Sequence, residues 1–126
     1  MPLMEWSEKL DIGVHEMNQE HQVLLGLMNK LYDQSKAGAS KLVLGATIAE
    51  LASYTVKHFD DEEKYMGRIG FPELDRHKLV HKDLLEKFTA FKKGFDAGPG
   101  KVSDDFFNFL QLWLAAHIQG IDRKYA

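Results

Sequence analysis

Apolar residues recur at steps of three and four along four long stretches of the chain, with polar residues between them. This spacing is the period of an α-helix that buries one face. The first stretch runs from about residue 18 to 36, the second from 41 to about 67, the third from about 72 to 95 and the fourth from 104 to 120. The inward stripe of the second stretch shows the rhythm, with Leu44, Ile48, Leu51, Thr55 and Tyr65.

Residues that begin or end helices stand at the boundaries of these stretches. Asn18, Ser40 and Ser103 can each accept a hydrogen bond from the first turn of a helix. Pro72 suits the start of a helix, and Gly38 suits its end. We therefore expect four helices joined by short connections.

The predicted fold follows from these elements. No stretch alternates strictly between apolar and polar residues, as a half-buried strand would, so the chain is predicted to be all-α. Four helices with short connections most economically form an up-down-up-down antiparallel four-helix bundle. At this length we expect one domain, residues 1–126, in which residues 1–17 form an N-terminal arm laid over one end and residues 18–126 form the bundle.

Composition and charge exclude several classes of protein. With 44% hydrophobic and 28% charged residues, the chain has an ordinary globular composition. A formal net charge of -3 without a basic stripe argues against a nucleic-acid partner. The N-terminus has no signal-peptide pattern and no apolar run could span a bilayer, so we expect a cytoplasmic protein without a membrane partner. Because the chain has no cysteine, nitrogen and oxygen atoms must hold any metal.

Histidines fall on the inward faces of all four predicted helices. His58 and Glu62 are one helical turn apart on one stripe, and His77 and His81 repeat this spacing in the third helix. Two side chains at this spacing can coordinate one metal ion. The full inward set of imidazoles and carboxylate is His21, His58, Glu62, His77, His81 and His117.

The cost of burying this set favours a bound cation. One histidine on an apolar face is more often a hydrogen-bonded core residue than a ligand. Several buried imidazoles without partners, however, would cost a few kcal/mol each, which is comparable with the whole stability of a small domain. Asp122 can supply a second carboxylate if Gly120 loosens the helix and lets it turn inward. Five imidazoles and two carboxylates are more ligands than one tetrahedral zinc can take. They suit two first-row metal ions, and two irons fit best.

The same residues resemble the hemerythrin family, and within it the bacterial single-domain hemerythrins. The similar motifs are NQEH at 18–21, HFDDEE at 58–63, HKLVH at 77–81 and WLAAHIQGID at 113–122, with Trp6 and IGV at 12–14 in the arm. The resemblance covers nearly the whole chain. No single motif is decisive, but all four in this order and spacing are highly specific.

The resemblance implies two non-haem irons bridged by carboxylates and an oxo or hydroxo group. One iron would be coordinatively full, and its ligands would be His77, His81 and His117. The other would be bound by His21 and His58, with Glu62 and Asp122 as bridges. In the family this second iron keeps an open position at which dioxygen binds reversibly.

An apolar wall around that position would slow oxidation by excluding water and protons. Our candidates for the wall, partly from the family pattern, are Leu24, Phe59, Trp113 and Leu114. Plain core packing explains each of them equally well. Because imidazole dominates the ligand set, the ferrous pair should be favoured and oxygen release feasible.

The implied function is reversible dioxygen binding for carriage, storage or sensing, and not catalysis. One alternative is an enzyme that uses the same centre as a peroxidase, an oxidase or a nitric oxide or nitrite reductase. Another is a metal-dependent structural or zinc-storage domain. An unidentified protein partner or reductant stays open in each case.

Some residues depart from the family pattern or lie beside it. Asn18 stands where the family commonly has Asp, which should affect the metal little because both residues cap helices. His15 lies outside the pattern, and we expect it at the surface. Among the acids beside Glu62 we expect a solvated face, although one of them could orient a ligand imidazole; these acids are Asp60, Asp61 and Glu63.

Overall fold

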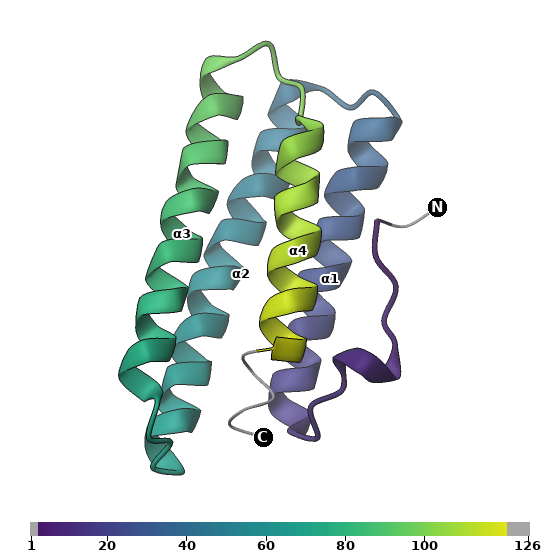
Figure 1. Ribbon diagram of the computed structural model, residues 1–126. Coiled ribbons are helices and arrows are strands. Elements are labelled where there is room, and N and C mark those ends of the chain that lie inside the picture. Colours follow the sequence, from purple (N-terminus) through teal and green to yellow (C-terminus); the bar gives the residue numbers. More distant parts are fainter. Residues whose placement is uncertain (1–2, 121–126) are drawn as a thin grey trace.

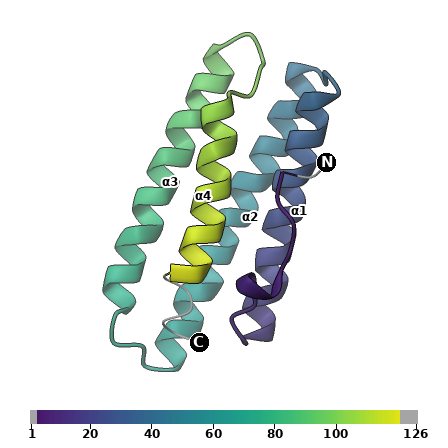
Figure 2. The ribbon, with the colours of Figure 1, turned by 45° about the vertical axis from the view of Figure 1, so that its right-hand side comes forward.

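The computed structural model describes residues 3–120, which form a bundle of four α-helices. Helix α1 spans His15–Lys36, α2 spans Lys41–Arg68, α3 spans Leu74–Ala97 and α4 spans Asp104–Gly120. A short 3-10 helix, η1, spans Glu8–Leu10. The four α-helices run alternately up and down and are joined by short connections (Figure 1, Figure 2). The described residues contain no strand, so the prediction of an all-α up-down-up-down bundle is confirmed.

Local hydrogen bonds explain where α1 ends and where α2 and α4 begin. Oγ of Ser40 accepts from the backbone N–H of Val43 at 3.3 Å, and Oγ of Ser103 accepts from that of Phe106 at 3.1 Å. Gly38 follows the end of α1 with a φ of +75°, where a side chain would be strained. The predicted roles of these three residues are confirmed.

The start of α1 differs from the prediction. The helix begins at His15, with Val14 before it, so Asn18 lies inside the first turn and does not cap it. Instead, Oδ1 of Asn18 accepts from the N–H of Ile12 at 3.0 Å, and Nδ2 of Asn18 donates to Oδ1 of Asp11 at 2.7 Å. The Asn18 side chain thus ties the preceding segment to the helix, and the arm is shorter than predicted.

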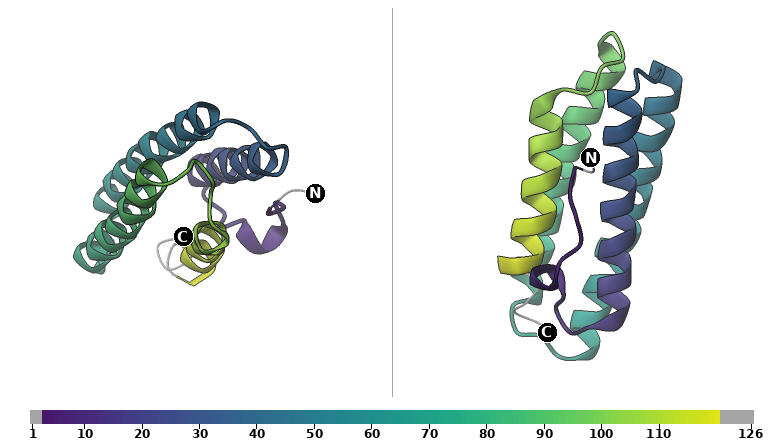
Figure 3. Two further views of the ribbon diagram at one scale, coloured as in Figure 1. Left: turned by 90° about the horizontal axis from the view of Figure 1, so that it is seen from above. Right: turned by 90° about the vertical axis from the view of Figure 1, so that its right-hand side faces the viewer.

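The arm lies along the side of the bundle beside α1 and α4, and not over one end as predicted (Figure 1, Figure 3). The N–H of Met4 donates to Oδ1 of Asn29 in α1 at 2.9 Å, and Nδ2 of Asn29 donates back to the carbonyl of Met4 at 2.8 Å. Nε2 of Gln111 in α4 donates to the carbonyl of Leu3 at 2.9 Å. These side-chain amides fix the course of the arm.

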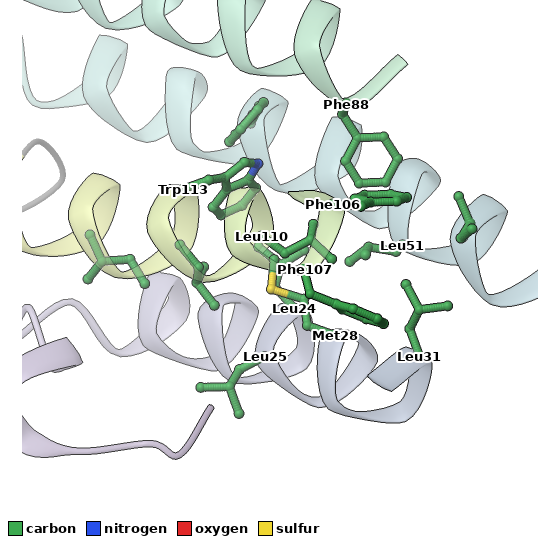
Figure 4. Packing of buried hydrophobic residues seen from close by; sticks show 14 of the residues in the cluster. Leu24, Leu25, Met28, Leu31, Leu51, Phe88, Phe106, Phe107, Leu110 and Trp113 are labelled. Carbon is green, nitrogen blue, oxygen red and sulfur yellow. The ribbon is translucent and has the colours of Figure 1, made fainter. Parts of the chain in front are cut away.

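The interior divides along its length into an apolar half and a histidine-rich half. The apolar half lies toward the α1–α2 connection and receives large side chains from all four helices, among them Leu31, Leu51, Phe88 and Phe106 (Figure 4). The buried histidines occupy the other half. Because neighbouring helices are antiparallel, early residues of α1 and α3 meet late residues of α2 and α4 there.

Each helix buries only one face. Met17, Met28 and Met66 are at most 2% exposed and fill the core. Charged residues cover the outer faces, as in the exposed ion pair of Lys64 with Asp60. None of the helices within residues 3–120 is both long and apolar enough to cross a membrane.

Candidate metal centre

Six buried polar side chains from all four helices meet in the histidine-rich half of the bundle. Helix α1 supplies one imidazole, α2 one imidazole and a carboxylate, α3 two imidazoles and α4 one. Each side chain continues the apolar face of its helix, so the packing that buries the leucines also turns these groups inward. All are at most 3% exposed: His21, His58, Glu62, His77, His81 and His117.

The carboxylate of Glu62 lies between two groups of imidazoles. Oε1 of Glu62 is 2.8 Å from Nε2 of His81 and 3.1 Å from Nε2 of His77. Nε2 of His117 is 3.7 Å from the same oxygen. Oε2, on the other side, is 3.3 Å from Nε2 of His58.

His21 completes the second group, with its Nε2 3.6 Å from Oε2 of Glu62. Three imidazoles therefore face one oxygen of Glu62, and two face the other. In each group the ligand atoms all lie within 4.8 Å of one another. The structure thus brings together every predicted ligand that lies within residues 3–120.

The spacing of these atoms fits a metal centre. Two ligand atoms that bind one ion at about 2.1 Å and at a right angle lie about 3 Å apart. The five distances from Glu62 to the imidazoles range from 2.8 to 3.7 Å, close to that spacing. Imidazole nitrogen with carboxylate oxygen is a donor set that suits divalent first-row metals.

The charge at Glu62 results from two opposing effects. Burial raises the pKa of the carboxyl group because it disfavours the charged form. The facing imidazoles, His117 foremost, favour the charged form and lower the pKa further than burial raises it, so the pKa of Glu62 lies well below its ordinary value. Glu62 is therefore a carboxylate at neutral pH and available as a metal ligand.

Two of the imidazoles face carboxylate oxygens at both ring nitrogens. Nδ1 of His58 is 2.7 Å from Oε1 of Glu20, and Nδ1 of His81 is 2.9 Å from Oε2 of Glu63. A neutral imidazole has one N–H and one lone pair, so it can donate to only one of its two carboxylates. If Nδ1 donates to the outer carboxylate, Nε2 and the facing oxygen of Glu62 are both acceptors and repel each other. A cation between these two atoms would remove that repulsion.

Sequence reasoning missed Glu20, and it named Glu63 only as one of three acids that could orient an imidazole. Glu20 in α1 contacts His58 in α2 across 38 residues of sequence. The spacing of residues within one helix does not predict a contact of this kind. Of the three acids, Glu63 is the one that contacts an imidazole. Asp60 and Asp61 pair with lysines on the outer face of α2, as expected for a solvated face.

The four predicted wall residues are all buried at this level of the bundle, and each is at most 4% exposed. The ring of Phe59 lies 5.6 Å from that of Trp113, and the Trp113 ring lies 6.1 Å from that of His117. Leu24 and Leu114 belong to the same hydrophobic cluster.

His15 is exposed, which confirms that it is a surface residue. Asp122 lies outside the described residues, so its predicted role as a second carboxylate ligand stays a prediction. Gly120 is the last residue of α4.

Known proteins resemble this chain over its full length. Residues 12–126 match the family described as "Hemerythrin HHE cation binding domain". The chain is 32% identical to the bacteriohemerythrin of Stenotrophomonas maltophilia, over 100% of this chain and 81% of the relative. It is 30% identical to that of Methylococcus capsulatus, over 99% and 95%. A crystal structure of wild-type hemerythrin matches with a TM-score of 0.89 and 30% identity, over 98% of this chain and 95% of that one.

Proposed function

Since this chain belongs to the hemerythrin family, we propose that it binds dioxygen reversibly at a centre of two non-haem irons. The observation that carries the proposal is the unequal division of five buried imidazoles between the two oxygens of Glu62. A carboxylate that faces two imidazole groups could hold one ion with each of its oxygens, and one of the groups contains one imidazole fewer than the other.

Each group of imidazoles would hold one iron. His77, His81 and His117 would bind the first through Nε2, and Glu62 would contribute Oε1. His21 and His58 would bind the second, to which Glu62 would contribute Oε2. Asp122 would supply a further bridge.

An ion held by the smaller group would have fewer protein ligands, so dioxygen could be added there as a ligand. The two ferrous ions would supply the electrons that dioxygen takes up and returns. The protein contributes mainly neutral imidazoles, and a ligand set with few carboxylates favours the ferrous state over higher oxidation states. Release of dioxygen, rather than its further reduction, is the expected outcome.

The apolar surroundings would protect this state. The rings of Phe59 and Trp113 lie beside the imidazole cluster and help to shield the imidazoles from solvent. Leu24 and Leu114 are 0% exposed and extend the same packing. Water and protons promote irreversible oxidation of a ferrous pair, so a dry wall keeps binding reversible.

An anaerobic titration tests the proposal. The purified protein is reduced, its visible spectrum is recorded, O2 is admitted and then removed by purging, and the cycle is repeated. A charge-transfer band that appears and disappears over several cycles, in protein with about two irons per chain, supports reversible binding. Loss of the ferrous state in the first cycle, or sustained turnover with peroxide, would favour the enzyme alternative, and a protein that takes up zinc but no iron would favour zinc storage.

A further inference from the structure

Two carboxylates outside the cluster contact its imidazoles from behind. Oε1 of Glu20 is 2.7 Å from Nδ1 of His58, and Oε2 of Glu63 is 2.9 Å from Nδ1 of His81. The two contacts serve different groups, because His58 faces Oε2 of Glu62 whereas His81 faces Oε1. Each group of imidazoles therefore has one outer carboxylate within the described residues.

A carboxylate at Nδ1 changes what the imidazole does at Nε2. It holds the ring proton on Nδ1, so the lone pair of Nε2 points inward, and it fixes the ring orientation. It also makes the imidazole a stronger donor, because the partial negative charge on the ring increases. Both effects act before a metal arrives and would shape the site in advance.

We propose that Glu20 and Glu63 are positioning residues that act separately on the two metal positions. Glu20 orients His58 for the position with two imidazoles, and Glu63 orients His81 for the position with three. This inference rests on the proposed function, since it requires two metal positions.

The surroundings of Glu20 and Glu63 differ. Nζ of Lys57 is 3.5 Å from Oε2 of Glu20 and 2.7 Å from Oδ2 of Asp61, so Glu20 belongs to an ion-pair network that reaches the surface. Glu20 also borders a surface hollow on α1, whereas Glu63 borders an open hollow of about 720 Å³ whose other lining residues belong to α3. The Glu63 side chain is 26% exposed, compared with 14% for Glu20. Both carboxylates are partly exposed, so a change of charge at either leaves the hydrophobic core residues in place.

The test uses Glu20→Gln and Glu63→Gln. Glutamine keeps the length of the side chain and can still accept a hydrogen bond, but it removes the charge. Glu16→Gln is the control for Glu20, because Glu16 is exposed one turn earlier on α1 and lines the same surface hollow. Glu86→Gln is the control for Glu63, because Glu86 is exposed and borders the same hollow as Glu63.

Cobalt(II) serves as the probe, because it binds imidazole and carboxylate and reports its site by absorption and by paramagnetic NMR. Metal-free protein is titrated with Co²⁺, and the shifted, exchangeable ring N–H signals are recorded. We expect each Glu→Gln variant to weaken one of two Co²⁺ positions about 10- to 100-fold and to move one N–H signal, a different one in each variant. The controls should bind two Co²⁺ ions as the unmodified chain does.

Melting curves of the metal-free proteins separate positioning from folding, because all five should melt at the same temperature. Unchanged affinities and unmoved N–H signals in both variants would overturn the inference, and so would equal weakening of both positions by either variant. If the unmodified chain binds fewer than two Co²⁺ and fewer than two Fe²⁺ ions, the proposed di-iron function fails first. The two failures are therefore distinguishable.

Discussion

The phenyl ring of Phe59 lies flat against the imidazole of His81, with ring centroids 3.8 Å apart and planes 6° from parallel. Phe59 is the residue after His58, so a helix that turns one imidazole inward also places this ring against another. The stacked ring limits the rotation of His81 from the side, while Glu63 holds Nδ1 at its edge. The apolar wall thus also helps to position the imidazoles.

Replacing Phe59 should affect both stability and the metal site. We expect Phe59→Leu to lower the free energy of unfolding by about 1 to 3 kcal/mol, since it leaves a partly filled space in the core, and to alter the visible spectrum of the iron-loaded protein. Phe88→Leu is the control, because Phe88 is buried in the apolar half. Urea unfolding should show similar losses in both variants, but only the first should change the spectrum. A spectral change in both would contradict this view of Phe59.

Removing one imidazole from the larger group should weaken both metal binding and the fold. We expect His77→Ala to hold less iron per chain and to gain less thermal stability from metal, because binding to the native state stabilises it. Elemental analysis and melting curves with and without a chelator measure both effects. His15→Ala, at an exposed position, should match the unmodified chain. Unchanged iron content and melting temperature in His77→Ala would show that His77 is not a ligand.

Shortening Leu114 should open the wall to water. Leu114 is 0% exposed, so Leu114→Ala should cost about 2 to 5 kcal/mol and speed oxidation of the ferrous protein in air. Leu31→Ala removes an equally buried side chain in the apolar half and should cost a similar amount without speeding oxidation. The decay of the oxygenated spectrum gives the rate. Equal rates in the two variants would assign Leu114 to packing alone.

Asp122 can be tested although it lies outside the described residues. We expect Asp122→Ala to abolish reversible dioxygen binding, because a bridging carboxylate is lost, while far-ultraviolet circular dichroism shows the same helix content. Asp104→Ala, at an exposed position in the first turn of α4, is a matched change of charge away from the site. Normal dioxygen binding in Asp122→Ala would show that Gly120 does not turn Asp122 into the site.

The helices and the inward direction of the ligands could be predicted from the sequence, because both depend on local physics. A repeat of three and four residues determines which face of a helix is buried, and it places His58 beside Glu62 whatever the helix packs against. Ser40 and Ser103 mark helix starts for an equally local reason, since each accepts from an N–H three residues later.

Tertiary structure alone decided the contacts that cross between helices. Glu20 contacts His58 across 38 residues of sequence, and Glu63 contacts His81 across 18. Both contacts join different helices, so the repeat within one helix cannot predict them. The start of α1 was mispredicted for the same reason, because Asn18 has its partners in the arm. Periodicity reports which face a residue lies on, whereas the alignment of neighbouring helices decides which atoms meet. The division of the imidazoles between the two oxygens of one carboxylate arises only from that alignment.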